Sequence, residues 1–379
     1  MPPPLMQSPP GPETVIDGVR YVYFGGTSYL GLHGHPDVIA AGCDALRTFG
    51  VHSATSRSGF GTTPGLLEVE SLAAQFFGAE EAFWFSSGYS ANHVIVPAVS
   101  EGVTDLFVEE SSHFCVQEAA RLAGVPVHPF RSGEAGDLAA QLRSRLRAGG
   151  RPMVMADGVG PSTGRVAPIA AYLEALAPFA PATLHLDDAH GFGVLGAHGR
   201  GVWEAAGLWP HVNGGPDCHG VRLTVCGTLA KALGGFGGIV PGTRAFVERA
   251  RASSHYFDGA SAPAAPLAGC AAAALRLCLA HPEWRDVLRS NVEVVRSGLR
   301  NLGISVTDEL TPNIGCAAGS AADMRRIHEN LKASGILVPY IPSYSGLGAE
   351  GILRLAVCAR HTPSHLTVLL SALQSTLRS

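Results

Sequence analysis

Lysine is scarce in this chain of 379 residues, which holds only Lys231 and Lys332 and carries almost all its positive charge on arginine. Charged residues make up 15% of the sequence and the formal net charge is −4, so the basic surface typical of a nucleic-acid-binding protein is missing. No apolar run is long enough to cross a bilayer, because the best one, residues 267–280, is alanine-rich and contains Arg276. We therefore expect neither a nucleic acid nor a membrane among the partners.

Paired cysteines are also missing. The eight cysteines stand singly, with no C-x-x-C and no Cys/His spacing of the kind that binds zinc. This usage predicts reduced, mostly buried thiols, no metal site and a cytoplasmic location. Residues 1–12, MPPPLMQSPPGP, have neither a basic n-region nor an apolar h-region, so we expect a disordered leader and not a signal peptide.

Strand and helix patterns alternate from residue 21 to residue 240. This alternation predicts an α/β protein with a large, doubly wound, mostly parallel sheet covered by helices on both faces. The expected strands are 21–24, 82–85, 106–108, 125–130, 152–156, 183–186, 223–225 and 238–240. The expected helices are 36–49, 66–77, 89–99, 113–122, 137–147 and 168–176.

The pattern changes after Tyr256, where the proline-marked segment SAPAAP leads into longer helices. The rest of the chain predicts a smaller C-terminal α+β domain. Its expected helices are 268–280, 282–302, 321–333 and 363–377, and its expected strands are 304–306, 314–317, 336–341 and 352–357. We divide the chain into an N-terminal segment and arm (1–44), a large domain (45–262) and a small C-terminal domain (263–379).

The stretch LTVCGTLAKALGGFGG, from Leu223 to Gly238, places Lys231 after a short strand and ahead of a glycine-dense segment. Loss of solvent lowers the pKa of a lysine and frees the neutral amine that Schiff-base chemistry with an aldehyde requires. A surface lysine after a turn explains this stretch equally well, so the stretch alone does not decide.

Polar residues follow three of the other expected strands. In HLDDAHGFG, Asp187 could hold a heterocyclic nitrogen protonated and His190 could reach a neighbouring oxygen; a helix cap and a loop histidine are the alternative. Ser87 and Gly88 lie between a strand and a helix, which suits a phosphate but also an ordinary serine cap. His113 opens a helix and could stack on an aromatic ligand, although a lone histidine there is more often structural.

Two short motifs point to other chemistry. GFGVLG, at 191–196, fits the dinucleotide pattern G-x-G-x-x-G, but polar DDAH precedes it and no helix pattern follows, so we treat it as a chance match. GPSTG, at 160–164, fits the serine-hydrolase pattern G-x-S-x-G. A nucleophile elbow needs an immediate strand-to-helix turn, and here the next helix pattern starts only near residue 168. A serine hydrolase is therefore a minority interpretation.

Seven blocks in one order resemble the α-oxoamine synthase family of pyridoxal-phosphate enzymes, which includes 8-amino-7-oxononanoate synthase, 2-amino-3-ketobutyrate CoA ligase, 5-aminolevulinate synthase and serine palmitoyltransferase. The resemblance runs from about Tyr23 to the C-terminus. Its blocks are YFGGTSYLGL, FSSGYSAN, the helix opening at His113, DGVGPSTGRVAPI, LDDAHGFGVLGAHGRG, GTLAKALGGFGG and ILRLAVCARHT. It implies fold type I and a homodimer with the active site at the subunit interface.

The resemblance implies a role for each of the polar residues singled out above. Lys231 would bind pyridoxal 5'-phosphate covalently and later act as a general base. Asp187 would keep the pyridine nitrogen protonated, so that the ring accepts electrons. His190 would contact the phenolic oxygen of the ring, and His113 would stack on the ring face.

The remaining implied contacts concern the phosphate and the substrates. Ser87, Gly88 and Tyr89 would cradle the phosphate, helped by Thr228, and Arg354 would hold the carboxylate of the amino acid through its planar fork.

Several positions depart from the family pattern. Thr27 replaces an asparagine that contacts the substrate carboxylate, and Asp157, which we assign to the cofactor site, replaces a glutamate. Leu66 replaces a histidine, Pro161 stands near a missing serine, and Asp258 with Gly259 replaces a Ser/Thr pair that reaches the phosphate of the partner subunit.

The implied activity is that of a C-acyltransferase. An amino acid would condense with an acyl thioester, bound to CoA or to a carrier protein, with loss of carbon dioxide to give an α-amino ketone. The sequences FSSGYSAN and SRSGFGTT resemble most the 8-amino-7-oxononanoate synthase branch of the family. Two alternatives stay open: a different reaction of the same carbanion (aminotransferase, aldolase-type lyase or decarboxylase), and a non-catalytic partner subunit, which the presence of Lys231 disfavours.

Overall fold

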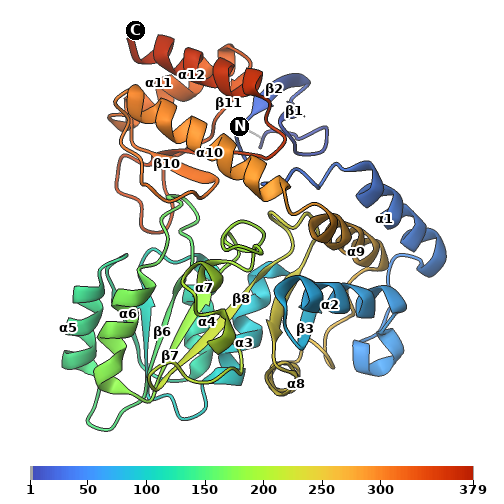
Figure 1. The fold of residues 1–379 in the computed structure, drawn as a ribbon, viewed down its shortest axis with the longest axis vertical. Coiled ribbons are helices and arrows are strands. Elements are labelled where there is room, and N and C mark those ends of the chain that lie inside the picture. The colour runs from blue at the N-terminus through green and yellow to red at the C-terminus, as the bar shows by residue number, and fades with distance from the viewer. Residues whose placement is uncertain (1–2, 379) are drawn as a thin grey trace.

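The computed structural model describes residues 3–378 and is built around a seven-stranded sheet (Figure 1). The strand order is β3-β9-β8-β7-β6-β4-β5; β9 is antiparallel to both of its neighbours, and β8, β7, β6, β4 and β5 run parallel. The bounds are β3 (Glu81–Phe85), β9 (Gly238–Gly242), β8 (Val221–Thr228), β7 (Ala182–Asp187), β6 (Pro152–Asp157), β4 (Asp105–Glu109) and β5 (Val127–Phe130). The predicted large, mostly parallel sheet is confirmed.

Helices cover both faces of this sheet, because successive side chains of a strand point to opposite sides. Met153 and Met155 of β6 face one apolar core, and Val154 between them faces the other. The first core includes α3 (Ala91–Val99), α4 (Phe114–Ala120) and α8 (Arg244–Ser253). The second includes α2 (Pro64–Phe77), α5 (Ala135–Arg145), α6 (Ile169–Leu176) and the short α7 (Val202–Ala205).

The C-terminal part forms a smaller α+β layer above the large sheet in Figure 1. Its antiparallel sheet has the order β10-β13-β12. The bounds are β10 (Asn313–Cys316), β13 (Ile352–Ala356), β12 (Tyr340–Ile341), α10 (Trp284–Asn301), α11 (Ala321–Ala333) and α12 (Pro363–Arg378). No helix within residues 3–378 is both long and apolar enough to span a membrane.

The N-terminal strands β1 (Glu13–Ile16) and β2 (Val19–Tyr23) join this C-terminal part, because β2 pairs in parallel with β11 (Ile336–Leu337). Helix α1 (Pro36–Phe49) then lies against α9 (Ala265–Ala280). This approach is close: a Cβ built on Gly269 would lie 2.5 Å from the carbonyl oxygen of Ala41, so the contact requires glycine.

The sequence-based element boundaries fit best where the apolar pattern is periodic. Helices 36–49 and 321–333 have the predicted bounds. The strand expected at 304–306 is wrong; Ile304 instead donates its N–H to the carbonyl of Leu299 and closes the end of α10. Helix α8 was not predicted.

The expected disordered leader is also wrong for its described part, because Leu5 and Gln7 hydrogen-bond to Asp17 and Val15. The three-domain division stays a prediction.

Candidate active site

A pocket of about 340 Å³ opens where β6, β7 and β8 end. In a parallel sheet these ends lie on one edge, so residues that are distant in sequence converge there. Every site residue expected from the sequence lines this pocket except Arg354. These residues are Thr27, Ser87, Gly88, Tyr89, His113, Asp157, Asp187, His190, Thr228 and Lys231.

Asp187 ends β7 with its carboxylate held from several sides. Asn92 of α3 donates from Nδ2 to Oδ2 at 2.6 Å, the backbone N–H of Ala189 donates to Oδ1 at 3.0 Å, and the Cys115 thiol lies 3.6 Å from Oδ2. Asn92 is itself oriented by His185, whose Nε2 lies 2.9 Å from the amide oxygen. The carboxylate is therefore held in place and buried, which suits a group that pairs with a cation of a ligand.

His190 follows three residues later and contacts Tyr29, with 2.8 Å between Nδ1 and the phenolic oxygen. Burial is the main cause that lowers the pKa of His190 well below its ordinary value, and nearby Lys231 and Arg354 add to it. Burial raises the pKa of Tyr29 to about 12, so its hydroxyl keeps its proton. Tyr29 therefore donates to Nδ1, and the neutral imidazole carries its proton on Nε2.

Lys231 lies in the loop after β8 with its amine in the pocket. Burial lowers the pKa of Lys231 below its ordinary value; Asp187 and Asp157 oppose this shift and Arg354 adds to it. A lysine whose ammonium form is disfavoured is a better nucleophile and a better proton acceptor.

The opposite end of the pocket is suited to an anion. Ser87 precedes a 3₁₀ turn that leads into α3, and no side chain caps the start of this turn, so the N–H groups of Gly88 and Tyr89 are free for a ligand. A Cβ on Gly88 would lie 2.5 Å from the Thr228 hydroxyl oxygen, which leaves room here only for glycine. Thr228 accepts from the N–H of Ala230 at 3.0 Å and thereby shapes the turn that carries Lys231.

Tyr89 lines the same end but uses its hydroxyl elsewhere. The phenol donates to Oε2 of Glu118 at 2.7 Å, and the side chain is 43% exposed. Its hydroxyl is thus engaged away from the expected phosphate, and its backbone N–H and ring remain for the site.

His113 and Asp157 both line the pocket and are hydrogen-bonded to each other. The backbone N–H of His113 donates to Oδ2 of Asp157 at 2.8 Å, and its Nδ1 accepts from the N–H of Cys115 at 3.2 Å. Burial, with repulsion from Asp187, raises the pKa of Asp157 well above its ordinary value. These bonds fix the imidazole as the cap of α4, and its ring still lines the pocket.

Arg354, on β13, lies beside the pocket and joins the two parts of the protein. Its guanidinium donates to the carbonyl oxygens of Pro161 (2.8 Å) and Gly26 (3.1 Å) and lies 3.4 Å from the Tyr29 hydroxyl. These contacts use three of its five N–H donors, so two remain for a substrate carboxylate.

Some functional neighbours were not assigned from the sequence. Tyr29, Asn92 and Cys115 all lie inside or next to quoted motifs, and YFGGTSYLGL and FSSGYSAN were the available signal for the first two. Of the departures from the family pattern, Leu66 is fully buried in the apolar core, and Asp258 forms an ion pair with His255 at 3.4 Å. Neither lines the pocket.

The dinucleotide-like and serine-hydrolase-like motifs both lack the strand-to-helix turn that their chemistry requires. After β7 the GFGVLG stretch forms turns, and the next helix, α7, starts only at Val202. After β6 the GPSTG stretch is also a turn, with α6 starting at Ile169. Among residues 3–378 no group of His, Cys, Asp and Glu side chains is arranged to hold a metal ion.

Comparison with known proteins gives a consistent result. The family "Aminotransferase class I and II" matches residues 21–373. The chain belongs to this family. The 8-amino-7-oxononanoate synthase of Delftia acidovorans is 34% identical over 99% of this chain and 91% of its own length, and that of Cellvibrio japonicus is 32% identical over 99% and 91%.

Solved structures place the chain among the α-oxoamine synthases. Serine palmitoyltransferase of Sphingomonas wittichii superposes with a TM-score of 0.88 at 26% identity, covering 99% of this chain and 92% of that one. A serine palmitoyltransferase structure with a pyridoxal-phosphate internal aldimine gives the same score and coverage at 27% identity. The family uses pyridoxal phosphate, and the chain is a pyridoxal-phosphate-dependent acyltransferase of fold type I.

The pocket of this chain fits that cofactor on its own evidence. It offers an amine with a lowered pKa, a buried carboxylate already fixed by Asn92, and an uncapped helix start beside a glycine that tolerates no side chain. These are partners for an aldehyde, a pyridinium nitrogen and a phosphate.

Proposed function

We propose that the chain condenses an amino acid with an acyl thioester, releasing carbon dioxide and the free thiol and leaving an α-amino ketone, as an 8-amino-7-oxononanoate synthase does. The observation that carries this proposal is the convergence of Lys231, Asp187 and His190 on one pocket with Arg354 beside it, in a chain whose similarity to such synthases spans nearly its full length. An 8-amino-7-oxononanoate skeleton divides between its keto and amino carbons into alanine and a dicarboxylic acyl thioester, so this pair is tested first.

Each of these residues has a separate role, which depends on its position in or beside the pocket. Arg354 binds the carboxylate of the amino acid with its two free donors, and Asp187 pairs with the protonated ring nitrogen. His190 would donate a hydrogen bond from Nε2 to the ring oxygen, because Tyr29 occupies Nδ1. Lys231 accepts the proton from Cα of the amino acid. Pyridoxal phosphate, when bound, supplies the electron sink that makes this proton removable.

We also propose a homodimer whose second copy covers the mouth of the pocket. Phe60 is fully exposed in a backbone conformation with φ of 75°, which is rare for a bulky residue. Tyr89 and Phe236, at the pocket mouth, are 43% and 47% exposed. Large apolar side chains left exposed at the surface of one chain are candidates for an interface. A cytoplasmic location is supported by the cysteines, all eight of which are free of disulfides.

The test uses the purified holoprotein. Alanine, glycine and serine are titrated while the visible absorption of the cofactor is followed, and a panel of CoA and carrier-protein thioesters is then added while thiol and carbon dioxide release are measured. Release of both in equal amounts supports the proposal. If amino acids change the absorption but no thioester is consumed, the acyl-transfer function is wrong and another reaction of the same carbanion replaces it.

Arg354→Lys refines this test, with Arg325→Lys on α11 as its control. Loss of the planar fork is expected to raise the half-saturating amino-acid concentration at least tenfold, since a bidentate charged contact contributes about 1.5–3 kcal/mol. The control is expected to match the unmodified protein.

A further inference from the structure

A second cavity, of about 210 Å³, lies next to the catalytic pocket at the carboxyl ends of β4, β5 and β6. The two cavities share Asp157 and Pro161 in their walls. One water molecule needs only about 10–15 Å³ of such space, so this side cavity has room for a group of several heavy atoms. A substrate held at Lys231 therefore has an adjoining space for one of its arms.

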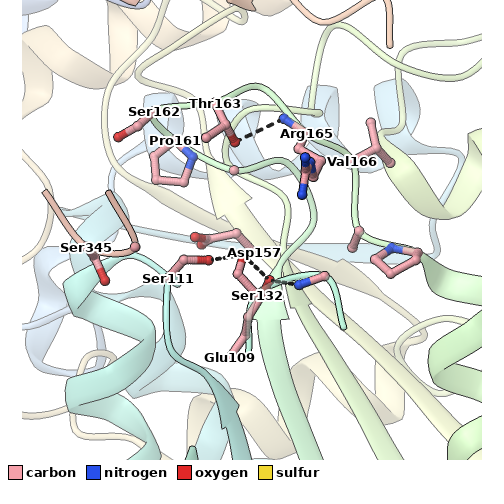
Figure 2. Close-up of a pocket in the computed structure, with 15 residues that line it drawn as sticks. Glu109, Ser111, Ser132, Asp157, Pro161, Ser162, Thr163, Arg165, Val166 and Ser345 are labelled. Atoms are coloured by element: carbon pink, nitrogen blue, oxygen red, sulfur yellow. Dashed lines mark hydrogen bonds between the residues drawn. The ribbon is translucent and has the colours of Figure 1, made fainter. Parts of the chain in front are cut away.

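The floor of the side cavity is a chain of hydrogen bonds that ends on a buried carboxylate (Figure 2). Ser111 donates to the Ser132 hydroxyl at 2.5 Å, Ser132 donates to Oε1 of Glu109 at 2.9 Å, and the N–H of Gly133 donates to the same oxygen at 2.8 Å. Both serine hydroxyls donate their hydrogens in the direction of Glu109. The Ser111 oxygen, the first in this series, can therefore still accept a hydrogen bond from a ligand.

Asp157 adds a second carboxyl group between the two cavities. Its side chain is more than nine-tenths buried; Oδ2 accepts from the N–H of His113, and Oδ1 has no hydrogen-bond partner within residues 3–378. Burial raises the pKa of Glu109, and the charge of Glu109 contributes to the raised pKa of Asp157. A positive charge between the two groups would relieve both effects.

The opposite wall is the loop of residues 160–168. Figure 2 shows Glu109, Ser111 and Ser132 gathered on one side of this space and Arg165 on the other. Arg165 also lines the cavity; it is exposed and its guanidinium forms no ion pair within the described residues, so solvent screens its charge more than it screens those of the buried Glu109 and Asp157. The buried interior is thus acidic and rich in acceptors.

We propose that this side cavity binds the end of a substrate arm that carries hydrogen-bond donors, above all a primary ammonium group. The proposal rests on the proposed function for the identity of the substrates. Two arms could supply this chemistry: the side chain of the amino acid and the tail of the acyl group. The side cavity disfavours a carboxylate end on either arm, because that end would face Glu109 and Asp157. The proposal therefore predicts that at least one substrate of this chain differs from the alanine and dicarboxylic acyl thioester that an 8-amino-7-oxononanoate skeleton implies.

The experiment compares ligands that differ only at their ends, with the holoprotein and binding as the readout. Norvaline and ornithine test the side chain of the amino acid, and their binding is followed by the visible absorption of the cofactor. Hexanoyl-CoA and its terminal amine and terminal carboxylic acid derivatives test the acyl tail, and their binding is followed by calorimetry, which needs no turnover. We expect the amine-bearing ligand of one of these two sets to bind at least tenfold more tightly than its apolar match, which identifies the substrate arm that enters the side cavity.

Glu109→Gln keeps the size of the side chain and removes its charge, and Glu110→Gln next to it, on an exposed residue, is the matched control. The preference for the amine is expected to fall to within about twofold in Glu109→Gln and to persist in Glu110→Gln. Ser132→Ala removes one bond of the floor and provides a milder variant if Glu109→Gln fails to fold; it is expected to reduce the preference.

Equal binding of amine and apolar ends in both arms, a preference that survives both cavity variants, or a preference for the carboxylic acid end would each overturn the proposal. Because both arms measure binding, this outcome is independent of whether thiol and carbon dioxide are released, which alone decides the proposed function.

Discussion

Asn92 donates a hydrogen bond to Asp187, with 2.6 Å between Nδ2 and Oδ2, across 95 residues of sequence. The amide is held in this orientation because the Asp187 carboxylate can only accept, so the amide oxygen faces Nε2 of His185, 2.9 Å away. Burial lowers the pKa of that imidazole to about 4, which keeps it neutral, and its Nε2 then carries the proton that the amide oxygen accepts. Helix α3 thus orients the carboxylate that we assign to the ring nitrogen of the cofactor.

Asn92→Leu is therefore expected to weaken cofactor binding. The substitution leaves one oxygen of Asp187 without its donor and Nε2 of His185 without its acceptor, at a cost of about 1–3 kcal/mol for each unsatisfied group. We expect at least a tenfold rise in the dissociation constant of pyridoxal phosphate, measured by absorbance titration of the apoprotein. Asn330→Leu, on the outer part of α11, is the control. Unchanged affinity in Asn92→Leu would show that the bond only stabilises the fold.

Lys231 offers a particularly clean chemical test, because Lys332 is the only other lysine of the chain and is exposed on α11. Borohydride reduction of the holoprotein is expected to attach the cofactor to the peptide that contains Lys231. Lys231→Ala is expected to abolish this attachment and reduce turnover by several orders of magnitude, whereas Lys332→Ala leaves both unchanged. Mass spectrometry of the digested protein provides the measurement; cofactor found on the Lys332 peptide would contradict the assignment.

Phe60 tests the proposed homodimer. A fully exposed phenylalanine contributes apolar area to an interface and little to the fold of one chain. Phe60→Asp is expected to shift the protein toward monomer and to reduce activity, as seen by analytical ultracentrifugation over a range of concentrations. Val19, 48% exposed on the distant strand β2, gives the control Val19→Asp. A monomeric unmodified protein with full activity would refute the dimer.

The sequence predicted the residues that end strands and missed those that support them. Asp187 and Lys231 follow apolar runs that can only be buried strands of a parallel sheet, so their common edge follows from topology. Asn92 and Tyr29 reach the site because of the way a helix and a loop pack against that sheet. This packing cannot be predicted from the local sequence pattern. The strand expected at 304–306 failed because the short run Ile-Ser-Val does not distinguish a strand from the closing turn of α10.

His361 makes the fold sensitive to acid. Its Nδ1 accepts from the N–H of Cys358 at 2.9 Å and its Nε2 lies 3.1 Å from the carbonyl oxygen of Tyr23, so both nitrogens are satisfied only in the neutral form. Burial lowers the pKa of His361 from 6.5 to about 4. Between these values the unfolded chain binds a proton that the folded chain excludes, so this group destabilises the fold as the pH decreases from 6.5 toward 4.

At pH 5 this contribution amounts to about 2 kcal/mol relative to neutral pH. His361→Gln keeps a donor and an acceptor but cannot be protonated, so its free energy of unfolding in urea should decrease less than that of the unmodified protein between pH 7.5 and pH 5, by about that amount. The control His255→Gln removes a histidine side chain that is 95% exposed; its ion pair with Asp258 lies on the surface and contributes little, so the pH dependence should stay close to that of the unmodified protein. Parallel curves for His361→Gln and the unmodified protein would mean that folding does not lower the pKa of His361, contrary to its burial and hydrogen bonds.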